Sequence, residues 1–207
     1  MTAWNPITTH ADPNSHLKLT DCPKKNNIRS LSTQHSSAEV FSGYLYVARM
    51  TRSELMYAIT AASRYCENPG KPHWGAVKRS LSYLAGTMYY RLYYGGDQPT
   101  NTLVAYTDSY FAACPDSRRL TSGTLFMFNG GPIAWNSHLQ KSLAQSTCEA
   151  EYYAARLGSR SIVWLKETST TNSDSSKRNQ LLSCVITRAR SGWYSTLCFT
   201  NETDKLN

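Results

Sequence analysis

The sequence lacks any run of about 18 apolar residues, so we expect no transmembrane helix and no membrane partner. Its start, Met-Thr-Ala-Trp-Asn-Pro, has neither a basic segment nor an apolar one, which argues against a secretory signal. None of the 6 cysteines forms a Cys-x-x-Cys pair, so a zinc site is not expected. Scattered single cysteines are typical of reduced thiols, and we therefore predict an intracellular protein, cytoplasmic or nuclear, that is not secreted.

Acidic residues are the scarcer charged type, with 14 Asp and Glu against 22 Lys and Arg, which gives a formal net charge of +8. Residues 1–40 contribute +1 (4 basic, 3 acidic), residues 41–167 contribute +5 (13 and 8), and residues 168–207 contribute +2 (5 and 3). The positive charge thus lies mainly in the middle of the chain. It suits a surface that binds nucleic acid, since neutralised phosphates release counterions, and it suits an ordinary basic surface equally well.

Composition divides the chain into three regions. Residues 1–40 are polar and broken by turn residues, so we expect loop or disorder there. Residues 41–167 hold nearly all of the periodic pattern, and at 207 residues and 41% hydrophobic content the chain can form one core. Residues 168–180 form a polar linker, which is followed by a short apolar run at 181–186 and an unpatterned end.

Helical periodicity predicts a small helical region over residues 41–96. Apolar residues recur at helical spacing in 53–65, and Asn-Pro-Gly at 68–70 ends that segment. The segment His73–Leu84 repeats the pattern and ends at Gly86. The two segments suggest an αα-hairpin, and Phe41–Arg49 is predicted as a third helix.

Strand patterns follow, and they predict the first half of an α/β domain over residues 97–167. The expected strands are Tyr89–Tyr94, Leu103–Thr107, Thr124–Phe128 and Ile133–Asn136, and Asn-Gly-Gly at 129–131 indicates a hairpin between the last two. A long helix is expected from Leu143 to Lys166. One stripe of this helix holds Glu151, Ala155, Gly158, Ile162 and Leu165.

Two carboxylates occupy positions where a metal site could form. Asp108 ends a predicted strand, and Glu151 lies near the start of the long helix. Mg²⁺ prefers hard oxygen ligands, and two such ions about 4 Å apart can hold the attacking water and the leaving oxygen of a phosphodiester. On spacing alone, however, solvated surface acids are the commoner explanation for such a pair.

A series of motifs gives this pair a specific context. In chain order they are Asp-Pro-Asn at 12–14, His-Trp at 73–74, Gly-Thr at 86–87, Tyr-Thr-Asp at 106–108, Leu-Thr-Ser-Gly at 120–123, Gly-Pro-Ile-Ala-Trp at 131–135 and Ser-Thr-Cys-Glu-Ala-Glu-Tyr at 146–152. Together they resemble the end of the reverse transcriptase region and the ribonuclease H region of a copia-type LTR retrotransposon Pol polyprotein. The resemblance covers roughly residues 10–167.

The resemblance implies an α/β fold, namely an incomplete ribonuclease H-like domain with a three-stranded antiparallel start and a long helix, preceded by a small helical connection region. It implies that Asp108 and Glu151 are the first two catalytic, metal-binding carboxylates, with Mg²⁺ as the ancestral cofactor. Glu149 is the alternative to Glu151. Two residues apart on a helix, their side chains point about 200° from each other, so only one can face a metal. We prefer Glu151 because it shares the stripe with Ala155.

The resemblance ends after residue 167. The family continues to a strand ending in Asp-Asn-Gln, which supplies a third acid, and a later segment supplies a final one, but neither occurs in residues 168–207. Asp174 and Asp204 lie in polar sequence and are poor substitutes. Our hypothesis is that the tail is frameshifted, because permitted codons for residues 184–189 can be chosen that spell Cys-Asp-Asn-Gln-Ser in the overlapping frame. We expect Leu181–Thr187 to fill the slot of the missing strand, parallel to Leu103–Thr107, and so to cover an apolar edge.

The sequence therefore predicts a remnant of a retrotransposon polyprotein whose ancestral activity is metal-dependent hydrolysis of RNA in an RNA–DNA hybrid, with little or no activity left. The alternatives are a non-catalytic nucleic-acid-binding module and a non-functional pseudogene product. No defined protein partner is expected. Asp116 is interpreted as a turn residue between the first two strands. The candidate nucleic-acid contacts are Arg52, Lys78, Arg79, Arg118 and Arg119.

The frameshift hypothesis predicts a specific nucleotide sequence. Sequencing the gene should show that the codons of residues 184–189 encode Asp-Asn-Gln in the frame two nucleotides on, with the shift between about residue 167 and residue 184. Codons in that stretch that do not encode Asp-Asn-Gln in the second frame would exclude the hypothesis.

Overall fold

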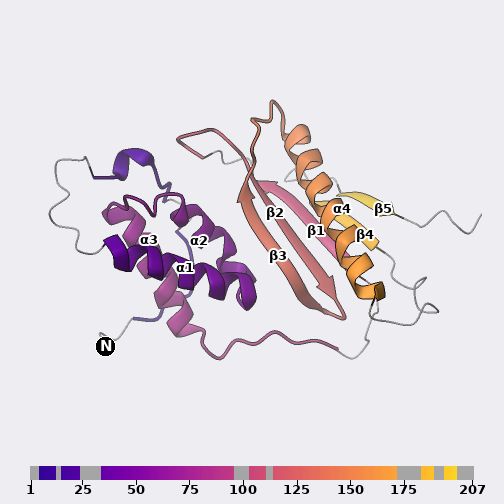
Figure 1. Ribbon diagram of the computed structural model, residues 1–207, viewed down its shortest axis with the longest axis horizontal. Coiled ribbons are helices and arrows are strands. Elements are labelled where there is room, and N and C mark those ends of the chain that lie inside the picture. The colour runs from indigo at the N-terminus through magenta and orange to yellow at the C-terminus, as the bar shows by residue number, and fades with distance from the viewer. Residues whose placement is uncertain are drawn as a thin grey trace, which may run out of the picture. The chain divides into compact units, whose positions relative to one another are not determined.

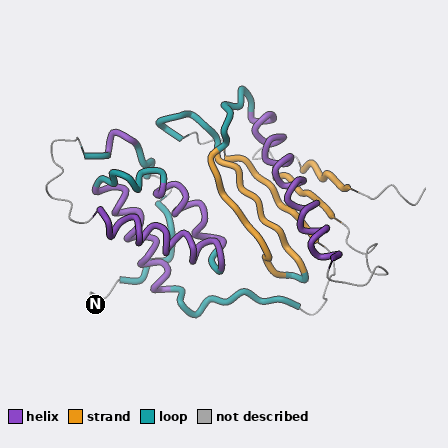
Figure 2. The backbone as a smooth tube through the Cα atoms, in the orientation of Figure 1, coloured by secondary structure: helices purple, strands orange, loops and turns teal. Residues whose placement is uncertain are grey.

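The computed structural model describes residues 5–12, 15–23, 34–95, 103–110, 114–171, 183–188 and 194–199. The chain forms two compact units (Figures 1 and 2). The first comprises residues 1–91 together with 114–118, and the second comprises residues 92–113 and 119–207. The predicted bounds after residues 40, 96 and 167 remain predictions. None of the helices in the described ranges has the length and hydropathy that a membrane crossing requires.

The first unit is helical, as predicted. It contains the 3-10 helices η1 (Leu19–Asp21) and η3 (Ser53–Leu55) and the α-helices α1 (Gln34–Met50), α2 (Met56–Ser63) and α3 (Lys71–Gly86). The three predicted helical segments are confirmed because their apolar stripes meet in one core. The helix α1 starts within the region predicted as loop, a correction to that prediction. The buried core residues include Phe41, Tyr44, Ala48, Leu55, Ile59, Ala62 and Val77.

The segment Tyr89–Tyr94 is not a strand, which corrects another prediction. Tyr89 is 84% exposed and Tyr93 is 79% exposed. Aromatic residues favour strands only where a neighbouring pleated surface can pack against them, and here most of the segment has none. Contact with the second unit's sheet begins at its end, where the Tyr94 hydroxyl donates to the Pro132 carbonyl over 2.8 Å.

The second unit contains one sheet of five strands in the order β3-β2-β1-β4-β5. The antiparallel part consists of β1 (Leu103–Tyr110), β2 (Thr121–Phe128) and β3 (Gly131–Leu139), so the predicted three-stranded start is confirmed. Asn129 and Gly130 have φ values of 49° and 77°, the left-handed conformation that a tight hairpin requires. The unit is α/β, as the sequence predicts.

The strand β4 (Ser183–Arg188) pairs in parallel with β1, from Leu103 opposite Ser183 to Thr107 opposite Thr187. This confirms the expected pairing over residues 183–187; Leu181 and Leu182 lie outside the described residues. The strand β5 (Tyr194–Phe199) pairs antiparallel with β4. It falls in a stretch that the sequence left unpatterned, so the prediction missed it.

The long helix α4 (Thr147–Thr171) covers one face of this sheet (Figure 1). Ile162 packs with Leu103, Ala105 and Phe126 in the hydrophobic core, which confirms the predicted apolar stripe. At Gly158 the helix comes so close to β1 that an added Cβ would lie 2.2 Å from Thr107 Cγ2. The absence of a side chain at residue 158 therefore sets the distance between helix and sheet.

A Gly158→Ala substitution should destabilise the chain. The new methyl group would overpack the interface, which typically costs about 1–3 kcal/mol and outweighs the gain of about 1 kcal/mol in helix propensity. The matched control is Gly75→Ala in α3, where nothing lies within 4 Å, and it should stabilise by about 1 kcal/mol. Urea unfolding measures both.

A second substitution tests whether the clash with Thr107 Cγ2 causes the loss of stability in Gly158→Ala. In a Thr107→Ser background Cγ2 is gone, and the next neighbour, Thr107 Cβ, would lie at 3.6 Å, an ordinary contact. Gly158→Ala should then become neutral or stabilising. An equal loss in both backgrounds would contradict the steric explanation.

Candidate functional site

The first candidate carboxylate, Asp108, lies in the last third of β1 and is exposed. Its partner in the antiparallel register is Gly123 of β2, which has no side chain to cover it. Because β1 is flanked by β2 and β4, Asp108 projects from the middle of the sheet and not from an edge strand. The local structure thus presents this carboxylate to solvent on a rigid strand.

Strand alternation decides the face on which Asp108 lies. Leu103, Ala105 and Thr107 are buried, and Thr107 packs against Gly158 of α4. Successive side chains of a strand point to opposite faces, so the Asp108 side chain lies on the face away from α4. The helix runs antiparallel to β1, because Gly158 lies against Thr107 whereas Ile162 packs with Leu103. Its N-terminal turns therefore lie towards the end of the sheet where Asp108 is found.

The second candidate, Glu151, is half-buried on α4, two turns before Gly158, or about 10 Å along the helix axis. Glu149 has a different role. Its Oε2 accepts a hydrogen bond from the Gln145 backbone N–H at 2.7 Å, and its own N–H donates to Ser146 Oγ at 3.1 Å. These bonds cap the start of α4 in the manner of a capping box, and they favour Glu151 over Glu149 as the residue that faces a reaction centre.

Sequence reasoning missed one buried polar residue beside this region, Gln140, which is 1% exposed. Its Nε2 donates to Ser122 Oγ at 2.9 Å and to the Ala150 carbonyl at 3.2 Å. Ser122 directly precedes Gly123, the partner of Asp108, and Ala150 directly precedes Glu151. The Gln140 side chain therefore connects the residues next to the two candidate acids. Its only signal in the sequence is a glutamine that directly follows a strand and precedes Lys141.

The described residues do not provide the ligand set of a two-metal Mg²⁺ site. Among the residues that the structure describes, no three His, Cys, Asp or Glu side chains form a group that could hold a metal ion. Asp108 and Glu151 are also presented from opposite sides of β1. A two-metal site needs more carboxylate ligands than this, so the described residues do not fit it.

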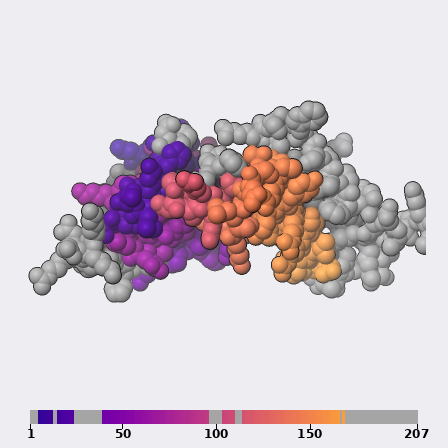
Figure 3. Space-filling model, turned by 90° about the horizontal axis from the view of Figure 1, so that it is seen from above, coloured from indigo at the N-terminus to yellow at the C-terminus, as the bar shows by residue number. Residues whose placement is uncertain are grey.

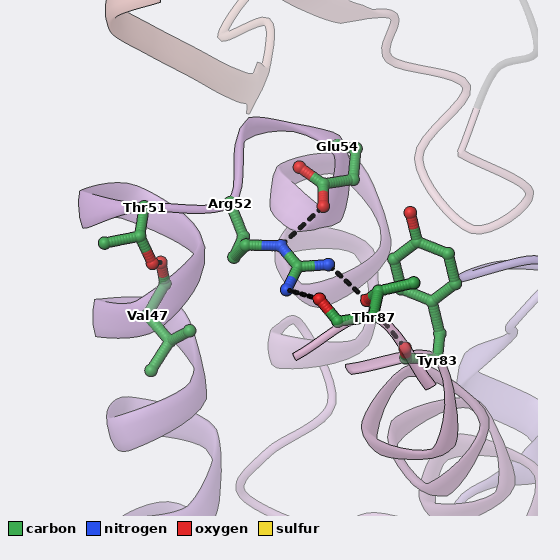
Figure 4. Close-up of polar contacts among 6 residues, drawn as sticks. All are labelled: Val47, Thr51, Arg52, Glu54, Tyr83 and Thr87. Carbon is green, nitrogen blue, oxygen red and sulfur yellow. Dashed lines mark hydrogen bonds and ion pairs between the residues drawn. The ribbon is translucent and has the colours of Figure 1, made fainter. Parts of the chain in front are cut away.

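Arg52, a candidate nucleic-acid contact, is buried inside the first unit (Figure 4). Its Nε donates to Glu54 Oε1 at 2.6 Å, its Nη1 to the Thr87 carbonyl at 3.1 Å, and its Nη2 to Thr87 Oγ1. The guanidinium carbon also lies 5.7 Å from the centre of the Tyr83 ring. A guanidinium with these internal partners joins η3 to the end of α3 and has little left to offer a phosphate.

The other basic candidates differ in how available they are. Lys78 and Arg118 are exposed in the first unit, and Arg118 has a φ of 54° in its turn. Arg79 is half-buried, and its Nη2 donates to Thr9 Oγ1 at 2.6 Å. Arg119 is exposed in the second unit. Lys78, Arg118 and Arg119 are thus exposed, whereas Arg79 is partly engaged with Thr9.

Asp116 is more than a turn residue, which corrects its interpretation. It belongs to the first unit, where Oδ1 and Oδ2 accept hydrogen bonds from the Leu19 N–H at 3.0 and 2.9 Å. Its Oδ2 also accepts a hydrogen bond from the Tyr65 hydroxyl at 2.7 Å. Burial and the neighbouring Asp116 carboxylate raise the pKa of Tyr65 well above its usual value. The carboxylate thus fastens the segment 114–118 to the first unit.

His73 lies beneath this anchor and is fully buried. Its ring stacks on Tyr65 with 4.2 Å between centroids. Its Nδ1 accepts a hydrogen bond from the Gly70 N–H at 2.9 Å, so the proton of the neutral ring is on Nε2, 3.1 Å from the Lys18 carbonyl. Burial lowers the pKa of His73, although Asp21 and Asp116 oppose this effect.

Comparisons with known proteins agree with the motifs. The chain is 40% identical over 153 residues to the retrovirus-related Pol polyprotein from transposon TNT 1-94 of Nicotiana tabacum, which covers 73% of this chain. It is 30% identical over 165 residues, or 80% of this chain, to the Pol polyprotein from transposon RE1 of Arabidopsis thaliana. The chain belongs to the retrovirus-related Pol polyproteins of transposons, and it spans 11% of each of these two relatives.

A further relative is matched over most of its own length. The secreted RxLR effector protein 161 of Plasmopara viticola is 39% identical over 121 residues, which are 58% of this chain and 84% of that protein. No family model matches the chain. No solved structure matches it either.

The buried histidine predicts acid sensitivity. Its pKa is lower in the folded chain than its ordinary value of 6.5, so the unfolded chain binds the proton more tightly. Stability should therefore be fully present above about pH 6.5 and fall as the pH drops below it. Burial lowers the pKa of His10 and His138 in the same direction. Urea unfolding between pH 5 and 7.5 measures the loss.

The contribution of His73 to the loss of stability at acidic pH can be measured with the variant His73→Asn. The Asn Oδ1 can still accept the Gly70 N–H but cannot be protonated in this range. The variant should be less stable at pH 7.5 because it loses the stacking on Tyr65, yet it should lose less stability on acidification than the wild type. Parallel curves for the two proteins would show that His73 does not cause the acid sensitivity.

Proposed function

We propose that this chain is a retrotransposon Pol remnant whose second unit descends from a ribonuclease H domain and retains little or no hydrolytic activity. The observation that carries the proposal is the topology around Asp108. The acid lies on a central strand that is paired antiparallel to β2 and parallel to β4, and α4 crosses one face. The family resemblance implies this arrangement for a ribonuclease H fold.

The ancestral reaction is metal-dependent hydrolysis of the RNA strand of an RNA–DNA hybrid. In this chain, Asp108 lies on the face of the sheet away from α4 whereas Glu151 lies on α4, so the two carboxylates would not meet at one cation. Mg²⁺ keeps several waters but is still bound through one or two carboxylates that face the same site, which this pair does not provide. Without further acids the ion would not be held in a fixed position, and positioned metals supply most of the rate in such reactions.

The proposal predicts at most residual cleavage of a labelled RNA–DNA hybrid in Mg²⁺ or Mn²⁺. Any cleavage that does occur should disappear in Asp108→Asn and in Glu151→Gln, whereas Glu149→Gln should leave it unchanged apart from a small loss of helix capping. Robust turnover that Asp108→Asn abolishes would overturn the conclusion that activity is lost. Cleavage that survives Asp108→Asn would point to a contaminating nuclease.

A second candidate function is non-catalytic binding of nucleic acid. The exposure of Lys78 and Arg118 and the net charge of +8 favour it. Binding of the hybrid that weakens steeply with salt, without cleavage, would support this function. The relative from Plasmopara viticola is matched over 84% of its own length, which supports a stand-alone fold for a protein of this kind.

A further inference from the structure

The outer face of α4 carries an exposed stripe of aromatic and basic side chains. Tyr152 is 70% exposed and Trp164 is 62% exposed, and Arg156 and Arg160 are exposed between them. With 3.6 residues per turn, these four positions fall within about a third of the helix circumference, opposite Gly158. They all belong to one helix of one unit, whose orange atoms form part of the surface in Figure 3.

The fold does not explain this stripe. In the described part of the chain, neither the Arg156 nor the Arg160 guanidinium has a hydrogen-bond or ion-pair partner, in contrast to the buried Arg52. The acids on the same face, Glu149 and Glu167, each lie seven residues from the nearer arginine, or about 10 Å along the axis. The charged side chains of the middle turns on this face are therefore both basic, and exposed Val163 lies beside them.

We propose that the stripe formed by Tyr152, Arg156, Arg160 and Trp164 binds single-stranded nucleic acid. The guanidinium groups can pair with phosphates, and the flanking rings offer flat surfaces on which bases stack. The stripe spans about 18 Å along the helix, a length that several nucleotides can cover. This site goes beyond the proposed function because it needs no metal and includes none of the basic residues predicted from the sequence.

The charge of the stripe argues against a second copy of the chain as the occupant. A symmetric dimer brings the same patch of each copy together, which would place two arginine pairs opposite each other. Like charges in contact are unfavourable, whereas a polyanion neutralises both arginines at once. The single strand is favoured over a duplex because stacking requires unpaired base faces.

The test measures binding of a fluorescein-labelled oligothymidine of about 12 nucleotides to the full chain by fluorescence anisotropy, in EDTA and at about 50 mM KCl. The variant Arg156→Glu/Arg160→Glu should weaken binding at least about tenfold and reduce its salt dependence. The matched control is Arg49→Glu/Lys141→Glu, which makes the same charge change at exposed positions outside the stripe and should have a much smaller effect.

Stacking has its own test. Binding should quench part of the tryptophan fluorescence, and Trp164→Leu should remove that quenching. Tyr152→Ala/Trp164→Ala should weaken binding several-fold without changing the salt dependence, whereas Tyr152→Phe/Trp164→Phe should keep most of the affinity. All these positions are exposed, so the thermal melts of the variants should match that of the wild type, and a variant that melts differently is replaced by the corresponding Gln or Leu variant.

The proposal is overturned if the wild type does not bind the oligonucleotide, if the control pair weakens binding as much as the arginine pair, or if the aromatic variants bind normally. Sedimentation that shows self-association abolished by Tyr152→Ala/Trp164→Ala would instead make the stripe a protein interface, and it would also overturn the proposal. Because EDTA removes metal, this result does not depend on hybrid cleavage, so the two proposals can fail separately.

Discussion

The close approach of α4 to β1 at Gly158 and Thr107 is the constraint on which the second unit depends. The short distance between helix and strand allows Ile162 of α4 to pack against Leu103 of β1 in the core. It also fixes the face of the sheet on which Thr107 lies, and hence the opposite face for Asp108. A helix that stood farther from the sheet would lose the core contacts and the placement of Glu151 together.

Polar contacts connect the elements of the first unit in addition to its apolar core. Arg52 joins η3 to the end of α3, and Asp116 joins η1 to Tyr65. Both residues make charge-assisted hydrogen bonds, but only Arg52 is buried, where an ionised group without its partner is costly, whereas Asp116 is exposed. In this unit, side chains that the sequence suggests for ligands or turns are used to connect helices.

The sequence predicted elements whose signal is local and missed interactions whose partners are distant. The helices around Ile59 and Val77 and the turn at Asn129 follow from periodicity and turn chemistry within a few residues. Thr87, which binds Arg52, lies 35 residues away in the sequence, and the partners of Asp116 lie 51 and 97 residues away. A pattern read over a few neighbouring residues cannot predict contacts between residues so far apart.

In the candidate site, the strand and the helix that carry the two acids could be predicted, because an apolar strand and an amphipathic helix each have a recognisable spacing of apolar residues. The face of β1 on which Asp108 lies could not, since alternation fixes relative faces only and the contact with Gly158 decides which one is covered. The roles of Gln140 and Glu149 were likewise set by where α4 begins.

The parallel pairing of β4 with β1 has an evolutionary consequence. A strand ladder is built from peptide N–H and carbonyl groups, which every amino acid except proline supplies in full. A sheet with a vacant central position is therefore a template that accepts many unrelated sequences of sufficient length and apolar character. A domain of this kind can keep its fold when its final segment is replaced by an unrelated sequence. Any function that depended on the replaced side chains is lost in the same step.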